Sequence, residues 1–290
     1  MRENYRKIIK KAYGFLEGNS HFRSKISDLK FSIFNYFKDD EEYSTLYSIF
    51  KALEQDYAKI LITLNNIEKI YSEYQRNEYK NNYVDWFNFD SPNSQLGCLI
   101  EYLFVKYRVI FEYIQEILDL TLPKKFNENE KKQFNSLNKK HDKYKFLLGY
   151  VYNNISDEEK EFLNIDWLEN IRINRNFLIH CGATCMACAD KKNDLIFQIN
   201  TRDFFDYKEL IEENIFYTNL DTNFIYYPRY WGLQLSRLIV FLVTILDFIT
   251  KDTQFDVEAK GMFELTFGQN LNFENDKETV LKNMLKKLIE

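Results

Sequence analysis

The chain has 290 residues, and 45% of them are hydrophobic, so a folded globular protein is favoured over a disordered one. The formal net charge of −5 excludes a surface that is basic throughout, so any nucleic-acid site must be a local patch. The opening residues, MRENYRKIIKKAYGF, mix charges throughout and lack the apolar core of a signal peptide, so we expect a cytoplasmic protein.

The first part of the chain is predicted to be helical. With only 8 Gly and 3 Pro in the chain, long helices joined by polar loops are expected. Apolar residues recur at helical spacing over 2–16, 24–37 and 40–75, and the first of these helices should end near Gly18. The polar segment that follows breaks this periodicity, and we place a domain boundary near Asp90.

A strongly apolar helix is predicted over 95–120, in which Glu101 is expected to be a surface carboxylate. After Pro123, the segment PKKFNENEKKQFNSLNKKHDKYK is rich in lysine. Lys139, Lys140 and Lys143 could bind the phosphates of an RNA strand, although a solvated loop or helix face explains them at least as well.

The segment 171–182, IRINRNFLIHCG, concentrates the polar groups that could do chemistry. Its apolar positions recur at helical spacing, Asp166 is predicted to cap the helix, and Gly182 is a natural place for it to stop. Positions four apart share a helix face, so Arg172, Asn176 and His180 should form one stripe with Arg175 beside it. The apolar residues should then lie on the other sides of the helix and pack in a core. They are Leu168, Ile171, Leu178 and Ile179.

These four residue types suit the cleavage of an RNA phosphodiester. The ordinary pKa of histidine lets His180 act as a general acid or base near neutral pH. Arg175 can hold phosphate oxygens, and Arg172 adds a second cation. Asn176 can donate a hydrogen bond that orients the ring of His180, one turn further along the helix. RNA supplies its own nucleophile, the 2′-hydroxyl, so the expected products are a 2′,3′-cyclic phosphate and a 5′-hydroxyl. The sequence suggests no metal or cofactor at this motif.

At Arg175, Asn176 and His180 the sequence resembles the HEPN superfamily, whose signature is an Arg, then Asn, Asp or His, then a His near a helix end. The resemblance implies an α-helical, metal-independent endoribonuclease, commonly a toxin or part of an antiviral defence system. It also implies a homodimer in which two motifs face each other, and an antitoxin or defence-system partner. HEPN toxins controlled by a nucleotidyltransferase antitoxin carry a Tyr two positions after the His, where this chain has Gly182.

Two other readings of the motif stay open. The protein could be a non-catalytic HEPN module that binds RNA or a nucleotide in the same groove. It could also be a helical scaffold in which the motif is a solvated face, with a favourable positive charge at the helix C-terminus.

Three cysteines follow the motif, at Cys181, Cys185 and Cys188. Their spacing resembles the iron–sulfur cluster motif of radical SAM enzymes. Those enzymes need a parallel α/β barrel, and the sequence shows neither its strands nor its glycine-rich strand ends. Zinc binding with His180 as the fourth ligand is a chemical alternative. We expect instead that the cysteines continue a helical face as small buried residues.

The last part of the chain contains the best strand candidate, 194–201, which could form a hairpin with 223–227. Helices are predicted at 206–213, at 230–249 after Pro228, and at 276–288. The most apolar run, 238–246, is too short to span a bilayer, so no membrane association is expected. The overall prediction is an all-α, HEPN-like up-down helix bundle with a small β-hairpin or irregular insertion. Its regions would be 1–90, 91–252 and 253–290.

Overall fold

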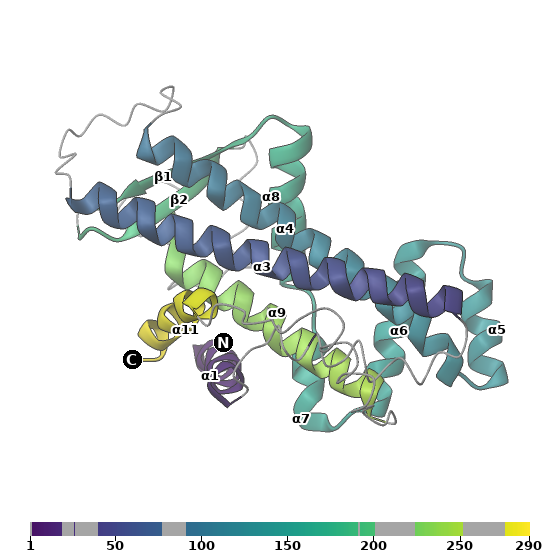
Figure 1. Ribbon diagram of the computed structural model, residues 1–290. Helices are drawn as coiled ribbons and strands as arrows, with labels where there is room; N and C mark the ends of the chain where they lie inside the picture. The colour runs from purple at the N-terminus through teal and green to yellow at the C-terminus, as the bar shows by residue number, and fades with distance from the viewer. Residues whose placement is uncertain are drawn as a thin grey trace.

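The computed structural model describes residues 2–18, 26, 40–76, 91–190, 192–200, 224–251 and 276–290. Helices dominate these residues, and a small antiparallel sheet accompanies them (Figure 1). This confirms the predicted all-α bundle with a small β insertion. The helix predicted at 206–213 lies outside the described residues, as does the helix predicted at 24–37 apart from residue 26.

The long helices lie close to where the periodicity predicts them. The α-helices are α1 (Arg2–Gly18), α3 (Asp40–Arg76), α4 (Pro92–Thr121), α5 (Glu128–Ser136), α6 (Lys140–Asn154), α7 (Asp157–Lys160), α8 (Leu168–His180), α9 (Tyr227–Thr250) and α11 (Asp276–Ile289). Short 3-10 turns occur at Leu122–Lys125 and Glu161–Leu163. The Ser91 side chain accepts a hydrogen bond from the backbone N–H of Ser94 and so caps α4.

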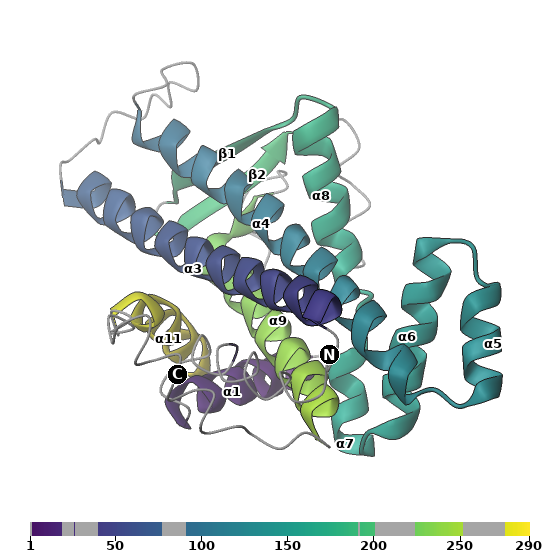
Figure 2. The same ribbon diagram turned by 45° about the vertical axis from the view of Figure 1, so that its right-hand side comes forward.

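The core lies between α3, α4 and α9. In both views α3 and α4 run side by side, and α1 and α11 pack along α9 (Figures 1 and 2). Trp231 on α9 is fully buried, and its ring centroid lies 4.8 Å from that of Phe104 on α4. One hydrophobic cluster contains residues of α1, α3, α4, α9 and α11, so all three predicted regions share a core. The division into three regions stays a prediction.

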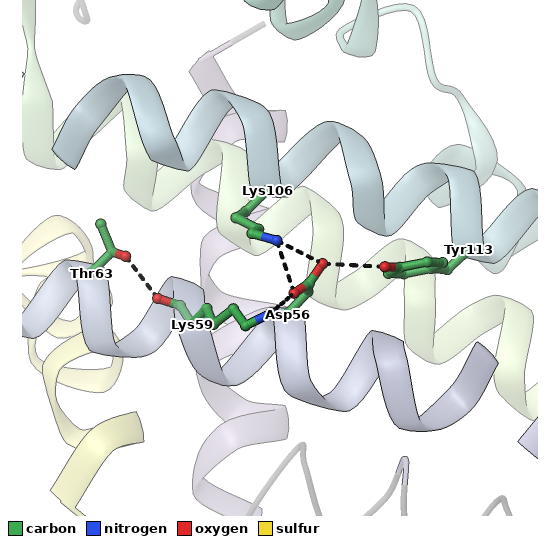
Figure 3. Close-up of polar contacts among 5 residues, drawn as sticks. All are labelled: Asp56, Lys59, Thr63, Lys106 and Tyr113. Atoms are coloured by element: carbon green, nitrogen blue, oxygen red, sulfur yellow. Dashed lines mark hydrogen bonds and ion pairs between the residues drawn. The ribbon is translucent and has the colours of Figure 1, made fainter. Parts of the chain in front are cut away.

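A buried ion cluster also joins α3 to α4 (Figure 3). The Asp56 side chain on α3 is 4% exposed and accepts hydrogen bonds from Lys59 Nζ at 2.7 Å and from Lys106 Nζ on α4 at 3.1 Å. The Tyr113 hydroxyl donates to the same carboxylate at 3.4 Å. Burial alone would raise the pKa of Asp56, but the two lysines outweigh it and lower that pKa. Asp56 is therefore ionised near neutral pH, and its bonds to Lys106 and Tyr113 link α3 to α4 beside their apolar contacts.

The sheet consists of β1 (Thr184–Ala189), β2 (Leu195–Asn200) and β3 (Ile225–Tyr226), in the order β1-β2-β3 and all antiparallel. Ile196 lies opposite Tyr226 and Phe197 opposite Ile225, which confirms the predicted pairing of 194–201 with 223–227. Phe197 is fully buried and anchors the sheet on Phe104 and Tyr230.

Residues spaced four positions apart on one face of α4 contact β1 and hold it in place. The Asn93 Nδ2 donates to the carbonyl of Ala187 at 2.9 Å, and the Glu101 carboxylate accepts from the backbone N–H of Cys185 at 2.6 Å. Between them lies Gly97, where an added Cβ would sit 2.3 Å from the Cys185 carbonyl oxygen. The absence of a side chain at Gly97 therefore lets the helix and the strand approach closely enough for both hydrogen bonds.

The most apolar helix, α9, is long and apolar enough to cross a membrane by length and composition. However, 78% of its most apolar 18-residue window is buried against other parts of the chain. The core helices of soluble proteins show the same combination, so the structure is compatible with a soluble protein.

Candidate functional site

The helix that carries the motif, α8, is anchored at its beginning. The Trp167 ring lies 5.4 Å from that of Phe111 and 5.9 Å from that of Tyr107, both on α4. Trp167 is also the N-cap residue, and no side chain caps the helix. The prediction that Asp166 caps α8 is therefore wrong, because packing of the Trp167 ring, rather than a carboxylate, sets where the helix begins.

The buried residues on the packed face of α8 recur every three positions. Leu168, Ile171 and Asn174 are buried, and Leu178 is partly buried against the core. Ile179 is 44% exposed, which contradicts the prediction that a core would hold it. The packed face is narrower than the apolar pattern suggests because the last turn of α8 extends beyond the core.

Arg175 and Asn176 are brought together in the last two turns of α8. Both are partly buried, and the Arg175 Nη1 donates a hydrogen bond to the Asn176 Oδ1 at 3.2 Å. The Arg175 Nε is buried without a hydrogen-bond partner. Helical geometry explains this burial, since Arg175 lies about 40° around the helix from the buried Ile171. The Nε side of the guanidinium is thus held against the protein, and Nη1 and Nη2 together keep three N–H groups beyond the one bound to Asn176.

His180 is the last residue of α8 and is exposed, as is Arg172 two turns earlier. Within the described residues, no hydrogen bond or ion pair joins His180 to Arg175 or Asn176. Five positions along a helix correspond to about 140° of rotation and about 7.5 Å of rise. The imidazole and the guanidinium of one chain therefore leave α8 in different directions, with His180 on the side opposite the core.

The chain reverses direction directly after His180. Gly182 has a φ of 65°, in the left-handed region that favours glycine, and so ends the helix as predicted. The carbonyl of Phe177 accepts hydrogen bonds from the backbone N–H groups of Cys181 at 3.1 Å and Ala183 at 3.2 Å. The turn leads straight into β1, so the contacts of β1 with α4 also fix the free end of α8.

Glu101 has a structural role at this junction. Its carboxylate is partly buried and binds the N–H of Cys185, which corrects the expectation of a surface carboxylate. Burial raises the pKa of Glu101, although the Cys185 N–H counteracts part of that rise. The residue positions β1 rather than reaching the motif.

The cysteines after the motif do not lie on one helical face, so that prediction is wrong. Gly182 ends the helix, and Cys185 and Cys188 lie in β1. Cys185 is buried and its pKa is raised by burial, whereas Cys181 is exposed. Burial raises the pKa of Cys188 to about 11. Among the described residues, no group of three or more His, Cys, Asp or Glu side chains could hold a metal ion.

The lysines proposed for RNA binding lie elsewhere. Lys139 and Lys140 are exposed at the start of α6, and the Lys143 Nζ lies 5.1 Å from the Phe134 ring centroid. The helices α5 and α6 stand at the end of α4 that is remote from β1 (Figures 1 and 2). The Gln115 Nε2 contacts the carbonyl of Lys140 at 3.4 Å, 14 positions along α4 from Glu101, or about 20 Å. These lysines therefore do not border the strand that follows His180.

Comparisons with known proteins add nothing to this geometry. No protein-family model, curated protein or solved structure was found to match the chain. The functional argument therefore depends on the residues of α8 and their surroundings.

Proposed function

We propose that the protein is a HEPN-type endoribonuclease that cleaves RNA without a metal ion and acts as a homodimer in the cytoplasm. The observation that carries the proposal is the arrangement at the end of α8. There His180 is open to solvent and Arg175 is held beside Asn176, while Arg172, two turns earlier, is also exposed. An open imidazole and a preorganised guanidinium are the two groups that transesterification by a 2′-hydroxyl requires.

In this mechanism His180 of one protomer accepts the 2′-hydroxyl proton as the 2′-oxygen attacks phosphorus. As the P–O5′ bond breaks, water or His180 of the other protomer donates a proton to the leaving 5′-oxygen. Arg175 binds the scissile phosphate and stabilises the charge that develops on it. Asn176 orients the guanidinium through the 3.2 Å hydrogen bond, so its role differs from the imidazole contact expected from sequence. Arg172 is a second cation for the RNA backbone. The products are a 2′,3′-cyclic phosphate and a 5′-hydroxyl.

Within one α8 the side chains of Arg175 and His180 point in different directions, and a homodimer could bring these two residue types together from two chains. If two copies of α8 meet at their free ends, His180 of one protomer can approach a phosphate held by Arg175 of the other. Ile179 is 44% exposed beside His180 and offers apolar surface for such a contact. We further propose a toxin or antiviral defence role, in which an antitoxin or defence-system partner controls the nuclease.

The test is the chemistry of the RNA ends. Wild type, His180→Ala and His141→Ala are incubated with total RNA in the presence of EDTA, and the ends of the fragments are mapped. His141 is the matched control because it is an exposed histidine on α6, far from α8. Cyclic phosphate ends from wild type and His141→Ala, lost in His180→Ala, support the proposal. Cleavage that requires magnesium, or that survives in His180→Ala, contradicts it.

The rival function is a non-catalytic module that binds RNA or a nucleotide. It predicts that wild type binds RNA without cleaving it, and that binding falls in Arg175→Gln. Neutralising Lys139, Lys140 and Lys143 tests the separate surface on α6, since a phosphate-binding patch would lose affinity and salt dependence. A purely structural scaffold is less favoured, because His180 and Arg172 are exposed rather than sealed into the core.

A further inference from the structure

The hairpin formed by α5 and α6 carries a positive charge that the rest of the chain does not share. Residues 124–145, which make up most of it, contain eight lysines and three acidic residues. They therefore carry a net charge of +5, while the remainder of the chain, whose total is −5, carries −10. Such a separation of charge within one molecule indicates a polyanion bound at the basic part of the surface.

The acidic groups of the hairpin do little to neutralise it. The Glu128 carboxylate pairs with Lys131 Nζ at 3.3 Å, and the Glu130 carboxylate accepts the backbone N–H of Asn127 at 2.8 Å in a capping box. Only Asp142, which is exposed, is left to offset the other lysines. The excess of positive charge is therefore a property of the folded hairpin as well as of its sequence.

Three lysines at the beginning of α6 hold most of this free charge. Lys139, Lys140 and Lys145 are exposed, and within the part of the chain that the structure describes they form no ion pair. Lys143 differs from them, because its Nζ lies over the Phe134 ring. Lysines that stay close together without counter-charges are stabilised by the phosphates of a bound strand, which release their own counterions in exchange.

One face of α4 leads from these lysines to the motif helix. Glu101, Arg108 and Gln115 are seven positions apart, so they lie on the same face. The Gln115 Nε2 contacts the carbonyl of Lys140 at 3.4 Å, and Glu101 binds the N–H of Cys185, just after the turn that ends α8. The face therefore spans about 20 Å, and Arg108 lies about 10 Å from each end.

Cations recur over this distance on one side of the molecule. In both views α8 and the connection between α5 and α6 lie on the same side of α4 (Figures 1 and 2). Arg108 is partly exposed, and its Nε lies 3.6 Å from the Glu112 carboxylate, which is a long ion pair. Arg172 is exposed on α8, and Arg175 follows it one turn later. Phosphates along a nucleic-acid strand are about 3.4 Å apart, so about six nucleotides cover 20 Å.

We propose that the α5–α6 hairpin is a docking surface for the backbone of an RNA strand, and that the strand continues along α4 to the motif on α8. The substrate is then an RNA that extends at least about six nucleotides from the cleavage site, because a shorter RNA reaches only one of the two surfaces. The position of the cleavage site rests on the nuclease proposed above. The docking surface does not.

The experiment measures RNA binding by fluorescence anisotropy in the His180→Ala protein, so that bound RNA stays intact. The probes are oligouridylates of 20 and 4 nucleotides, in EDTA and at 50 to 200 mM salt. The α6 variant replaces Lys139, Lys140 and Lys145 with Gln. Its matched control replaces three exposed lysines on α3 and α11 with Gln, namely Lys69, Lys286 and Lys287, so both variants have the same net charge.

The α6 variant should bind the longer RNA more weakly and with less dependence on salt. Each lost phosphate contact lowers the salt slope by about 0.7, so three lost contacts lower it by about 2. Between 50 and 200 mM salt the parent should therefore lose about 15- to 20-fold more affinity than the α6 variant. The control should behave as the parent. Replacing the same three lysines with Arg should restore the salt slope, which separates loss of charge from misfolding.

Equal affinity and equal salt slope in the α6 variant and the control would overturn the proposal. So would a parent that binds no RNA, or one that binds the tetranucleotide as tightly as the longer RNA. Wild type that binds RNA with this dependence but never cleaves it would refute the nuclease and leave the docking surface in place. Cleavage that is insensitive to the α6 lysines would have the opposite meaning.

Discussion

The close approach of α4 and β1 gives the sharpest test of the fold around the candidate site. In Gly97→Ala the new Cβ would lie 2.3 Å from the Cys185 carbonyl oxygen, whereas such atoms ordinarily stay at least about 3.3 Å apart. The strand must therefore move by roughly 1 Å, which breaks the bonds of Glu101 to the Cys185 N–H and of Asn93 to Ala187. Losing both costs about 3 to 4 kcal/mol, and alanine returns about 1 kcal/mol through its better helix propensity. The net destabilisation should be about 2 to 3 kcal/mol.

Urea unfolding followed by circular dichroism measures this difference. Gly149→Ala is the matched control, since Gly149 is also helical and an added Cβ there meets nothing within 4 Å. It should stabilise the protein by up to about 1 kcal/mol. If Gly97→Ala unfolds at the same urea concentration as Gly149→Ala, the close contact does not hold β1 against α4.

Three further predictions follow from single residues. Asp56→Asn should lower the free energy of unfolding by about 1 to 2 kcal/mol at pH 6, because it weakens the bonds from Lys106 and its neighbours. Since folding lowers the pKa of Asp56, this stabilisation is present above about pH 4 and is lost as the pH falls through the pKa of Asp56 in the folded protein. The unfolding curves of wild type and Asp56→Asn should therefore converge in acid. Gly182→Ala should cost about 1 kcal/mol in a thermal melt because of the left-handed φ of 65°, and an unchanged melting temperature would argue against that turn. Iodoacetamide should label Cys181 quickly in the native protein and Cys185 only after unfolding; mass spectrometry that finds Cys185 labelled first would contradict its burial.

The long helices could be predicted because each buries a stripe that repeats with the helical period. For α3, α4 and α9 the apolar pattern alone indicates the element within a few residues, and the residues around position 228 mark the start of α9. The strand β1 could not be predicted in this way. Its sequence, TCMACA, alternates little in hydrophobicity, and it is held by side chains of α4 that are distant in the chain. The sequence signals available for this strand were Gly182 before it and Asn193 in the turn after it. In the structure Asn193 has a φ of 63°.

The exposure of the motif residues was partly predictable from the sequence, and their geometry was less so. Helical periodicity correctly indicates that Arg172 and His180 face solvent and that Arg175 lies beside Asn176. It could not show that Arg175 turns toward the packed side of α8, because that depends on which face α4 covers. The Asn93 and Glu101 contacts, which position the end of the motif helix, also depend on tertiary structure. Their spacing of four around Gly97 was visible, but nothing local indicates that a strand binds there.

The manner in which α4 holds β1 also limits how the protein can associate with other chains. Among the strands that the structure describes, β1 is an outer one, and the edge of such a strand normally offers free backbone groups to a strand from another molecule. Here Glu101 and Asn93 occupy the N–H of Cys185 and the carbonyl of Ala187 on that edge. Because α4 also packs along this strand, a strand from another molecule could pair with β1 only if α4 moved away, which favours helical surfaces for self-association on this side.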